Sequence, residues 1–307
     1  MTILISLIPA LLTAVGLVPL ILMIHLWKER DRRASRQSPL ARNFLRPPGH
    51  SLRAKLSKLD EQIIAYLFVI LIAPLMLYSI HISQSYFTSQ PESLTRVAVT
   101  VVMGLIALVI ASWRMTKVVN ERKITALGLE GELATAEDLN QLMLEGCRVF
   151  HDIPFPYGNI DHVVVSHSGI FSVNSKLRGK PRLGDGKAEV SVDLANGLLT
   201  FPDRTCNIPI KQFETEANWL TDHLTSAVGC PVAVEPMLAL PGWFIKERIG
   251  RGKVFVLNPH KSRKFFVHNR ETLTPEQVQQ VAHQLEQLCR DVEPSFQQKT
   301  ERWEDLN

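Results

Sequence analysis

The chain has 307 residues and a formal net charge of +4. Its mean hydropathy of +0.05 is high for a soluble protein and low for a protein built only of membrane helices. That length accommodates about two units, at roughly 150 residues per domain. The four cysteines are widely spaced and form no C-x-x-C pair, which excludes a disulfide framework and a zinc ribbon.

Three apolar runs are long enough to cross a bilayer, which takes about 17–25 residues. None of them contains Asp, Glu, Lys or Arg: Thr2 to Leu26, Ile63 to Ile82 and Val97 to Trp113. The first run has no basic residue before it and exceeds the usual apolar core of a signal peptide, so we expect a retained helix. We therefore predict a membrane anchor over residues 1–117, with helices at about 2–26, 62–82 and 97–115.

The charge around these runs predicts their orientation. The loop at 28–60 holds ten Lys and Arg against three acidic residues, whereas the stretch 81–96 holds a single Arg. The positive-inside rule then places the N-terminus outside and everything after residue 117 in the cytoplasm. We expect a multi-pass protein of a bacterial-type inner membrane, whose basic loop contacts the anionic headgroups of the lipid bilayer. Nucleic-acid binding by this loop is the alternative.

Residues 118–292 read as a compact cytoplasmic α/β domain, followed by a polar tail at 293–307. Helical spacing of apolar residues alternates with short β-rich runs and Gly- or Pro-containing turns. The last helix opens with a capping box from Thr274 to Gln277. The expected helices are 127–144, 209–228 and the one from 275 onward, and the expected strands are 149–153, 160–165, 170–173, one or two edge strands within 180–199, 232–240 and 253–257.

A short constellation within this domain suggests phosphodiester chemistry. Residues two apart in a strand share a face, so Asn174 and Lys176 point together, and the hairpin brings Asp161 towards the same end. Glu132 approaches from the preceding helix. Hard cations such as Mg²⁺ take oxygen ligands, and a neighbouring lysine can stabilise charge that grows on a phosphate. By spacing alone, a solvated helix Glu, a turn-capping Asp and an edge-strand Lys explain the same residues.

These motifs resemble the NERD, or nuclease-related, domain, a relative of the PD-(D/E)XK nucleases. The resemblance spans about residues 123–260 and rests on GLEGE at 128–132, GNIDHVVV at 158–165, GIF at 169–171 with the following x-x-Lys, and CNIPIKQ at 206–212. It implies a restriction-endonuclease-type α/β fold that acts on DNA or RNA with Mg²⁺ or Mn²⁺.

The resemblance also implies roles for individual residues. Glu132 and Asp161 would bind the metal, Lys176 would be the catalytic lysine, and Gln212 would support the active site. Asn174 stands where the family pattern has Glu, so it offers an amide oxygen to the metal without a formal charge. His162 belongs to the motif but should point away from Asp161 in a regular strand.

Two basic groups could hold a nucleic-acid backbone. The first comprises Lys176, Arg178, Lys180, Arg182 and Lys187, and the second comprises Lys246, Arg248, Arg251, Lys253, Lys261, Arg263 and Lys264. Aromatic residues beside the second group suit stacking on unpaired bases, and the alternative is a solvated loop beside core aromatics: Trp243, Phe244, Phe265 and Phe266.

The sequence is compatible with three functions. The first is a membrane-anchored, metal-dependent nuclease. The second is a catalytically degenerate nucleic-acid-binding or scaffold module, and the third is a membrane-assembly component in which the anchor matters most. Protein partners are not indicated by the sequence.

Overall fold

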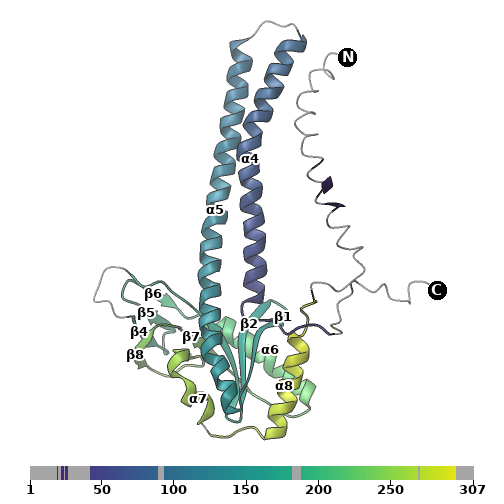
Figure 1. The fold of residues 1–307 in the computed structure, drawn as a ribbon. Helices are drawn as coiled ribbons and strands as arrows, with labels where there is room; N and C mark the ends of the chain where they lie inside the picture. The colour runs from purple at the N-terminus through teal and green to yellow at the C-terminus, as the bar shows by residue number, and fades with distance from the viewer. Residues whose placement is uncertain are drawn as a thin grey trace, which may run out of the picture. The chain divides into compact units, whose positions relative to one another are not determined.

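The computed structural model describes residues 42–294 apart from 89–92, 182–187 and 269, together with Pro19, Leu22, Met23, His25 and Leu26. The chain divides into two compact units, whose elements are labelled in Figure 1. The described core of the first unit is Leu56–Lys123, and the second unit joins Leu40–Lys55 to Ile124–Pro294.

The first unit is made of two long apolar helices, α4 (His50–Thr88) and α5 (Leu94–Asn140), which also extend into the second unit. Within the described residues, these two helices are long and apolar enough to cross a membrane. They contain the predicted spans at 62–82 and 97–115. The predicted span at 2–26 lies outside the described residues except for its five described positions. Pro74 lies inside α4, and Arg122 of α5 forms an ion pair with Asp60.

α5 is one continuous helix where the sequence suggested two, at 97–115 and 127–144. The polar residues that follow the apolar run are good helix formers, and no proline interrupts them, so the helix continues. It ends in a single 3₁₀ stretch, η1 (Gln141–Glu145), which Gly146 closes in a left-handed conformation with φ of 89°.

The second unit contains a five-stranded mixed sheet in the order β1-β2-β3-β7-β9. β1, β2 and β3 pair antiparallel, and β7 and β9 add parallel to β3. Its strands are β1 (Arg148–Phe155), β2 (Gly158–Ser166), β3 (Gly169–Ser175), β7 (Val234–Ala239) and β9 (Phe255–Leu257). The predicted hairpin at 160–173 is confirmed, and Gly169 at its turn has a φ of 149°.

A smaller four-stranded sheet has the order β6-β5-β4-β8. Its strands are β4 (Glu189–Asp193), β5 (Leu198–Thr200), β6 (Thr205–Asn207) and β8 (Phe244–Ile249). Apolar side chains of this sheet form a common core with Leu238 and Val256 of the main sheet and with Phe213. The solvated loop that was the alternative for the second basic group is not present at 244–249, because these residues pair with β4 as a strand.

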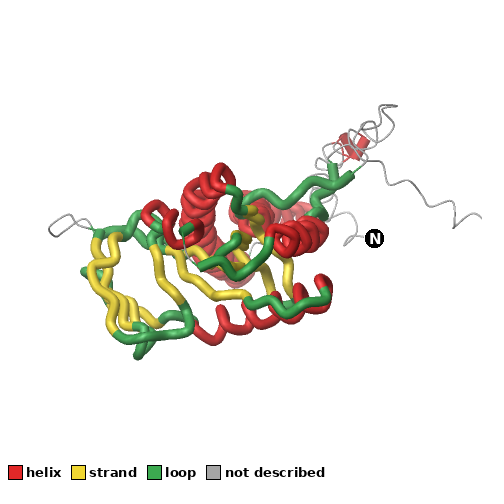
Figure 2. The backbone as a smooth tube through the Cα atoms, turned by 90° about the horizontal axis from the view of Figure 1, so that it is seen from below, coloured by secondary structure: helices red, strands yellow, loops and turns green. Residues whose placement is uncertain are grey.

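Helices lie on both sides of the main sheet, as Figure 2 shows. α6 (Ile210–Val228) and α8 (Pro275–Cys289) cover one face and share a core with Ile170 and Val163. The end of α5, η1 and α7 (Arg263–Val267) cover the other face over Phe171 and Val173. A short 3₁₀ turn, η2 (Pro259–Lys261), precedes α7. The predicted capping box of α8 is confirmed: Thr274 and Gln277 exchange hydrogen bonds of 2.9 and 3.2 Å.

Two glycines of the helix that leads into the domain have different surroundings. A Cβ added at Gly131 would lie 2.6 Å from the Cβ of Leu177 and 3.1 Å from its backbone nitrogen. A Cβ added at Gly128 would only touch Leu52, at 3.5 Å. Gly131 therefore lets α5 approach the segment that follows β3, whereas the packing at Gly128 has room for a methyl group.

We predict that Gly131→Ala destabilises the domain by about 1–3 kcal/mol, because its methyl group forces the backbone of Leu177 away. Gly128→Ala should be neutral or stabilising by up to about 1 kcal/mol, because alanine favours a helix. Denaturant unfolding of the full-length protein in detergent, followed by tryptophan fluorescence, measures both. Equal stability of the two variants would contradict the close approach at Gly131.

Candidate active site

The end of the β2–β3 hairpin carries Asp161 and the residues that bind it. Asp161 Oδ2 accepts a hydrogen bond of 2.7 Å from the backbone amide of Ser175. Asp161 as a whole residue is partly buried. The antiparallel register thus holds the carboxylate of β2 against the end of β3, as the hairpin predicted.

Glu132 reaches the site from α5 and is only 4% exposed. Its Oε2 atom is buried and has no hydrogen-bond partner among the described residues. The backbone amide of Gly49 lies against the carboxylate and favours its charged form. A buried carboxylate oxygen without a hydrogen-bond donor destabilises the folded state unless a cation binds it.

Asp152 lies on β1 opposite Asp161, and sequence reasoning did not single it out. It is fully buried, and its φ of 52° is the one positive value at a non-glycine residue in the described chain. Its carboxylate accepts hydrogen bonds from Arg46 at 3.0 Å and from the Ser51 hydroxyl at 2.7 Å. Asn159 also donates to it, at 3.1 Å. The segment before α4 and the first turn of α4 are therefore part of this site.

Asn174, Gln212 and Glu216 form a second group beside Asp161. Asn174 Nδ2 donates to Glu216 Oε2 at 2.7 Å, and Gln212 Nε2 donates to Glu216 Oε1 at 2.9 Å. Glu216 is 1% exposed. Sequence reasoning named the two amides but missed the carboxylate that they both hold.

One signal in the sequence could have revealed Glu216. The buried positions of α6 follow helical spacing, and Glu216 is the one acidic residue among them. An acidic residue on the apolar face of a helix is rarely buried without a partner. The buried face consists of Phe213, Glu216, Ala217, Leu220 and Leu224.

Lys176 follows the last residue of β3. Its backbone amide donates to the carbonyl of Ala239 at 2.9 Å, which extends the parallel pairing of β3 and β7 by one residue. The residue is half-exposed. The extended backbone of β3 therefore continues to Lys176, two residues after Asn174, and the lysine side chain is partly exposed to solvent.

The carboxylates raise the pKa values of one another. Burial raises the pKa of Glu132, and the charges of Asp161 and Asp152 add to that effect. Burial likewise raises the pKa of Asp161, with smaller contributions from Glu216 and Asp152, against the opposing hydrogen bond from Ser175. The pKa of Glu216 is raised by burial, although its bonds from Gln212 and Asn174 oppose the change. The site thus concentrates negative charge that the protein itself only partly compensates.

His162 lies on the other face of β2 from Asp161, as strand alternation predicts. Its Nε2 is 3.1 Å from the Ser175 hydroxyl, and its Nδ1 is 2.9 Å from Nδ1 of His151. Burial lowers the pKa of His151 to about 4 and that of His162 well below its usual value. These uncharged rings support Ser175 from behind, while the Ser175 amide binds Asp161 on the site side.

The aromatic residues of the second basic group are mostly core residues. Trp243 and Phe266 are 2% and 0% exposed, so they do not offer faces to unpaired bases. Phe265 packs against the core under the main sheet, and Phe244 alone of the four is exposed, with Lys261 over its ring. Of the two interpretations of these four residues, core packing therefore holds for three, and stacking on bases stays open for Phe244 alone.

Several residues of the two basic groups have partners within the domain. Lys253 pairs with Glu214 at 2.8 Å, and Arg263 pairs with Glu145. Arg248 donates to the carbonyl of Val256, and Arg178 lies over the ring of Phe201. Arg182 and Lys187 of the first basic group lie outside the described residues.

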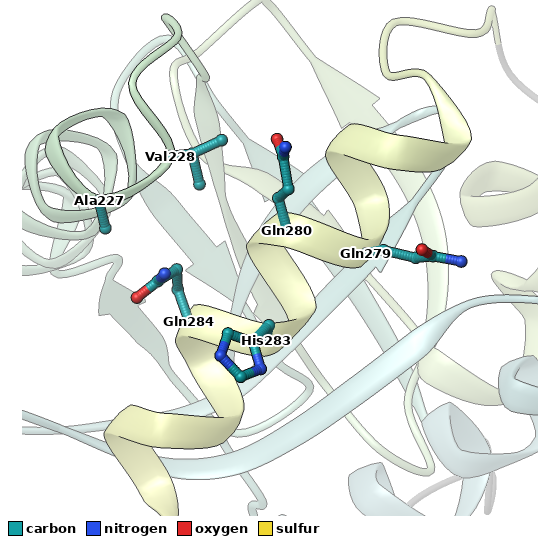
Figure 3. Close-up of a pocket in the computed structure, with 6 residues that line it drawn as sticks. All are labelled: Ala227, Val228, Gln279, Gln280, His283 and Gln284. Atoms are coloured by element: carbon teal, nitrogen blue, oxygen red, sulfur yellow. The ribbon is translucent and has the colours of Figure 1, made fainter.

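A surface hollow of about 340 Å³ lies between the end of α6 and α8 (Figure 3). Its lining consists of Ala227, Val228, Gln279, Gln280, His283 and Gln284. It contains none of the carboxylates described above and no lysine, so it is separate from the candidate active site.

The donor set at the site suits a hard divalent cation. In the described part of the chain, no three His, Cys, Asp or Glu side chains already form a metal-binding group. Mg²⁺, however, is usually held by one or two carboxylates, with water and substrate completing its shell. The buried, unpartnered Oε2 of Glu132 and the half-buried Asp161 are oxygen donors of this type. The residues present therefore fit such an ion.

Comparison with known proteins identifies this region. The NERD family model, described as nuclease-related domain, matches residues 127–241. The chain therefore carries a nuclease-related domain, which implies the PD-(D/E)XK superfamily. No curated protein and no solved structure matches the chain significantly. The matched range contains Glu132, Asp161, Asn174, Lys176, Gln212 and Glu216.

We predict that Asp161→Asn stabilises the domain at alkaline pH while removing a carboxylate from the site. Because the folded pKa of Asp161 is raised above its unfolded value near 4, its ionisation favours the unfolded state as pH rises through that interval. The variant should gain on the order of 2 kcal/mol over the wild type at pH about 9, and little at pH about 4. Denaturant unfolding at the two pH values measures the difference.

Asp291→Asn serves as the matched control with the opposite sign. Arg46 donates to Asp291 and lowers its pKa, so the charged form stabilises the fold at neutral and alkaline pH. This variant should be less stable than the wild type at alkaline pH. A loss of stability for Asp161→Asn at alkaline pH would contradict the described environment of that carboxylate.

Proposed function

We propose that this protein is a membrane-anchored, metal-dependent nuclease that hydrolyses phosphodiester bonds of DNA or RNA at the cytoplasmic face of a bacterial-type inner membrane. One observation carries the proposal. Within the segment matched by the nuclease-related family, Glu132, Asp161 and Lys176 come from separate elements to one end of the main sheet. Carboxylates can hold the metal ion, and a lysine can stabilise phosphate charge, which is the combination that suits metal-assisted phosphodiester cleavage.

Glu132 and Asp161 would hold Mg²⁺ or Mn²⁺ through their carboxylates, and Asn174 would contribute its amide oxygen. Because Asn174 Nδ2 is engaged by Glu216, its Oδ1 atom is the one left for another partner. When bound, such an ion neutralises phosphate charge and lowers the pKa of a water molecule. The Ser175 amide would keep Asp161 in place during the reaction.

Lys176 would orient the attacking water and stabilise charge on the phosphate through its ammonium group. Its half-exposed position at the end of β3 leaves the side chain accessible to a substrate. Gln212 would support the site indirectly, because its amide donates to Glu216 and does not bind Asp161. The first basic group would attract the nucleic-acid backbone.

The membrane anchor would place this chemistry beside the bilayer. The apolar segments of α4 and α5 and the run at 2–26 would form three spans, with the N-terminus outside. The basic loop at 28–60 would then lie in the cytoplasm next to anionic lipids. The exposed apolar side chains of α4 and α5 support a lipid environment for these helices.

A second function is favoured by Asn174, which stands where the family pattern carries a glutamate. A site with one carboxylate fewer would bind a cation less tightly. The domain would then act as a non-catalytic nucleic-acid-binding or scaffold module on the same anchor. Salt-sensitive binding without cleavage is the expected behaviour of such a module.

We predict that the full-length protein in detergent cleaves DNA or RNA in the presence of Mg²⁺ or Mn²⁺. Lys176→Ala should lower the rate by about 10²–10³-fold, because it removes one donor that stabilises transition-state charge. Gel analysis of single- and double-stranded substrates of both kinds measures the rate. A chelator should abolish cleavage by the wild type.

Lys123→Ala is the matched control, because Lys123 is an exposed lysine of α5 that belongs to neither basic group. It should cleave at the wild-type rate. Equal loss in both lysine variants would point to general charge attraction instead of a role in chemistry. Binding without cleavage by the wild type, under all four substrate conditions, would sink the nuclease proposal and favour the binding module.

A further inference from the structure

Glu216 is a buried carboxylate that neutral groups hold in place. Both of its oxygens accept hydrogen bonds from side-chain amides, Oε2 from Asn174 and Oε1 from Gln212. Among the described residues, no Lys, Arg or His pairs with it. Its side chain is 1% exposed, so water reaches it poorly.

Burial of this charge destabilises the folded domain, which is not expected of a residue that only fills space in the core. Transfer of a charged carboxylate from water into the protein interior is unfavourable, and hydrogen bonds from two neutral amides offset only part of that desolvation free energy. A glutamine or a leucine on the apolar face of α6 would fill the same space without the charge. The charge of Glu216 also repels that of Asp161, which adds to the cost.

A second, independent observation concerns another carboxylate of the site, whose buried oxygen has no donor. Glu132, from a different helix, is 4% exposed, and its Oε2 has no hydrogen-bond partner in the described chain. The charge of Asp161 acts on Glu132, and that of Glu216 acts on Asp161. The carboxylates of Glu132, Asp161 and Glu216, from α5, β2 and α6, therefore repel one another. Arg46 does not neutralise them through a hydrogen bond, because it donates to Asp152 and Asp291.

We propose that Glu216 supplies the metal centre, from α6, with the negative charge that Asn174 does not supply from β3, and that it strengthens cation binding by Glu132 and Asp161 through this charge. This inference rests on the proposed function, because it assigns a residue to the same divalent-cation site. Asn174 and Gln212 are then positioning residues: their amides hold the two oxygens of Glu216 near Asp161.

The hydrogen bond between Asn174 and Glu216 makes a direct exchange of roles testable. Glu216→Gln removes the charge and keeps the size of the side chain, and its carbonyl can still accept from an amide. Asn174→Glu alone would place two carboxylates 2.7 Å apart and should fold poorly. The double variant Asn174→Glu/Glu216→Gln restores one carboxylate and one amide with their positions exchanged.

The test is Mn²⁺ binding by the full-length protein in detergent, measured from the electron paramagnetic resonance signal of the free ion. Glu216→Gln should weaken binding at least about tenfold, and the exchanged double variant should recover affinity to within about threefold of the wild type. Circular dichroism of each variant verifies that it is folded. Glu214→Gln, on the same helix but paired with Lys253, is the control and should bind as the wild type does.

The outcomes separate this inference from the proposed function. Wild-type affinity in folded Glu216→Gln would overturn the role of Glu216 and leave the nuclease proposal intact. Absence of Mn²⁺ binding by the wild type would overturn both. A third outcome combines tenfold weaker Mn²⁺ binding by Glu216→Gln with no cleavage of nucleic acid by the wild type. It would support the role of Glu216 in metal binding and reject catalysis.

Discussion

The buried carboxylate of Asp152 is the contact on which the rest of the second unit's site depends. It joins β1 to Arg46 in the segment before α4, to Ser51 in the first turn of α4, and to Asn159 at the start of β2. Its left-handed backbone also redirects the strand. Ile153 and Ile160 beyond it lie in the same core as Phe150 and Val163, where strict alternation would place them on the opposite face.

This contact makes the segment at 42–53 part of the nuclease-related unit, although the family match begins only at residue 127. The same segment brings the Gly49 amide to Glu132, so a region that precedes the apolar helix α4 takes part in shaping the site. Arg46 bridges Asp152 and Asp291, and thereby ties the segment to the end of α8 as well. Residues outside the range of the family match therefore contact the carboxylates of the site.

The concentration of acids at one end of the sheet carries a stability cost that a purely structural design would avoid. Burial and mutual repulsion raise the pKa values of Glu132, Asp161 and Glu216, so each destabilises the fold when ionised. Amides and backbone N–H groups offset part of this cost. On the opposite face, His151 and His162 stay uncharged and add no positive charge to balance it. Carboxylates with perturbed pKa values in one place are typical of functional sites, which supports the proposed role of this group.

The sequence by itself determined the local structure and the chemical identity of most of the site. Helical and two-residue spacing predicted α6, α8 and the β2–β3 hairpin, because those periods follow from backbone geometry alone. The same spacing paired Asn174 with Lys176. The extended α5 and strand β8 were missed, since a long helix needs no turn signal and an edge strand such as β8, with its Lys, Glu and Arg, lacks an apolar pattern.

Only the tertiary structure decided which groups meet. Glu216 lies 42 residues after Asn174, and Arg46 lies 106 residues before Asp152, so neither contact leaves a local pattern in the sequence. Packing likewise turned Trp243 and Phe266 into core residues, because burial depends on what the neighbouring sheets supply and not on the charges beside them. Glu132, Asp161 and Lys176 were thus readable from the sequence one at a time. Glu216 and Asp152 were not, because their place in the site depends on long-range packing, which brings distant side chains into one low-dielectric region.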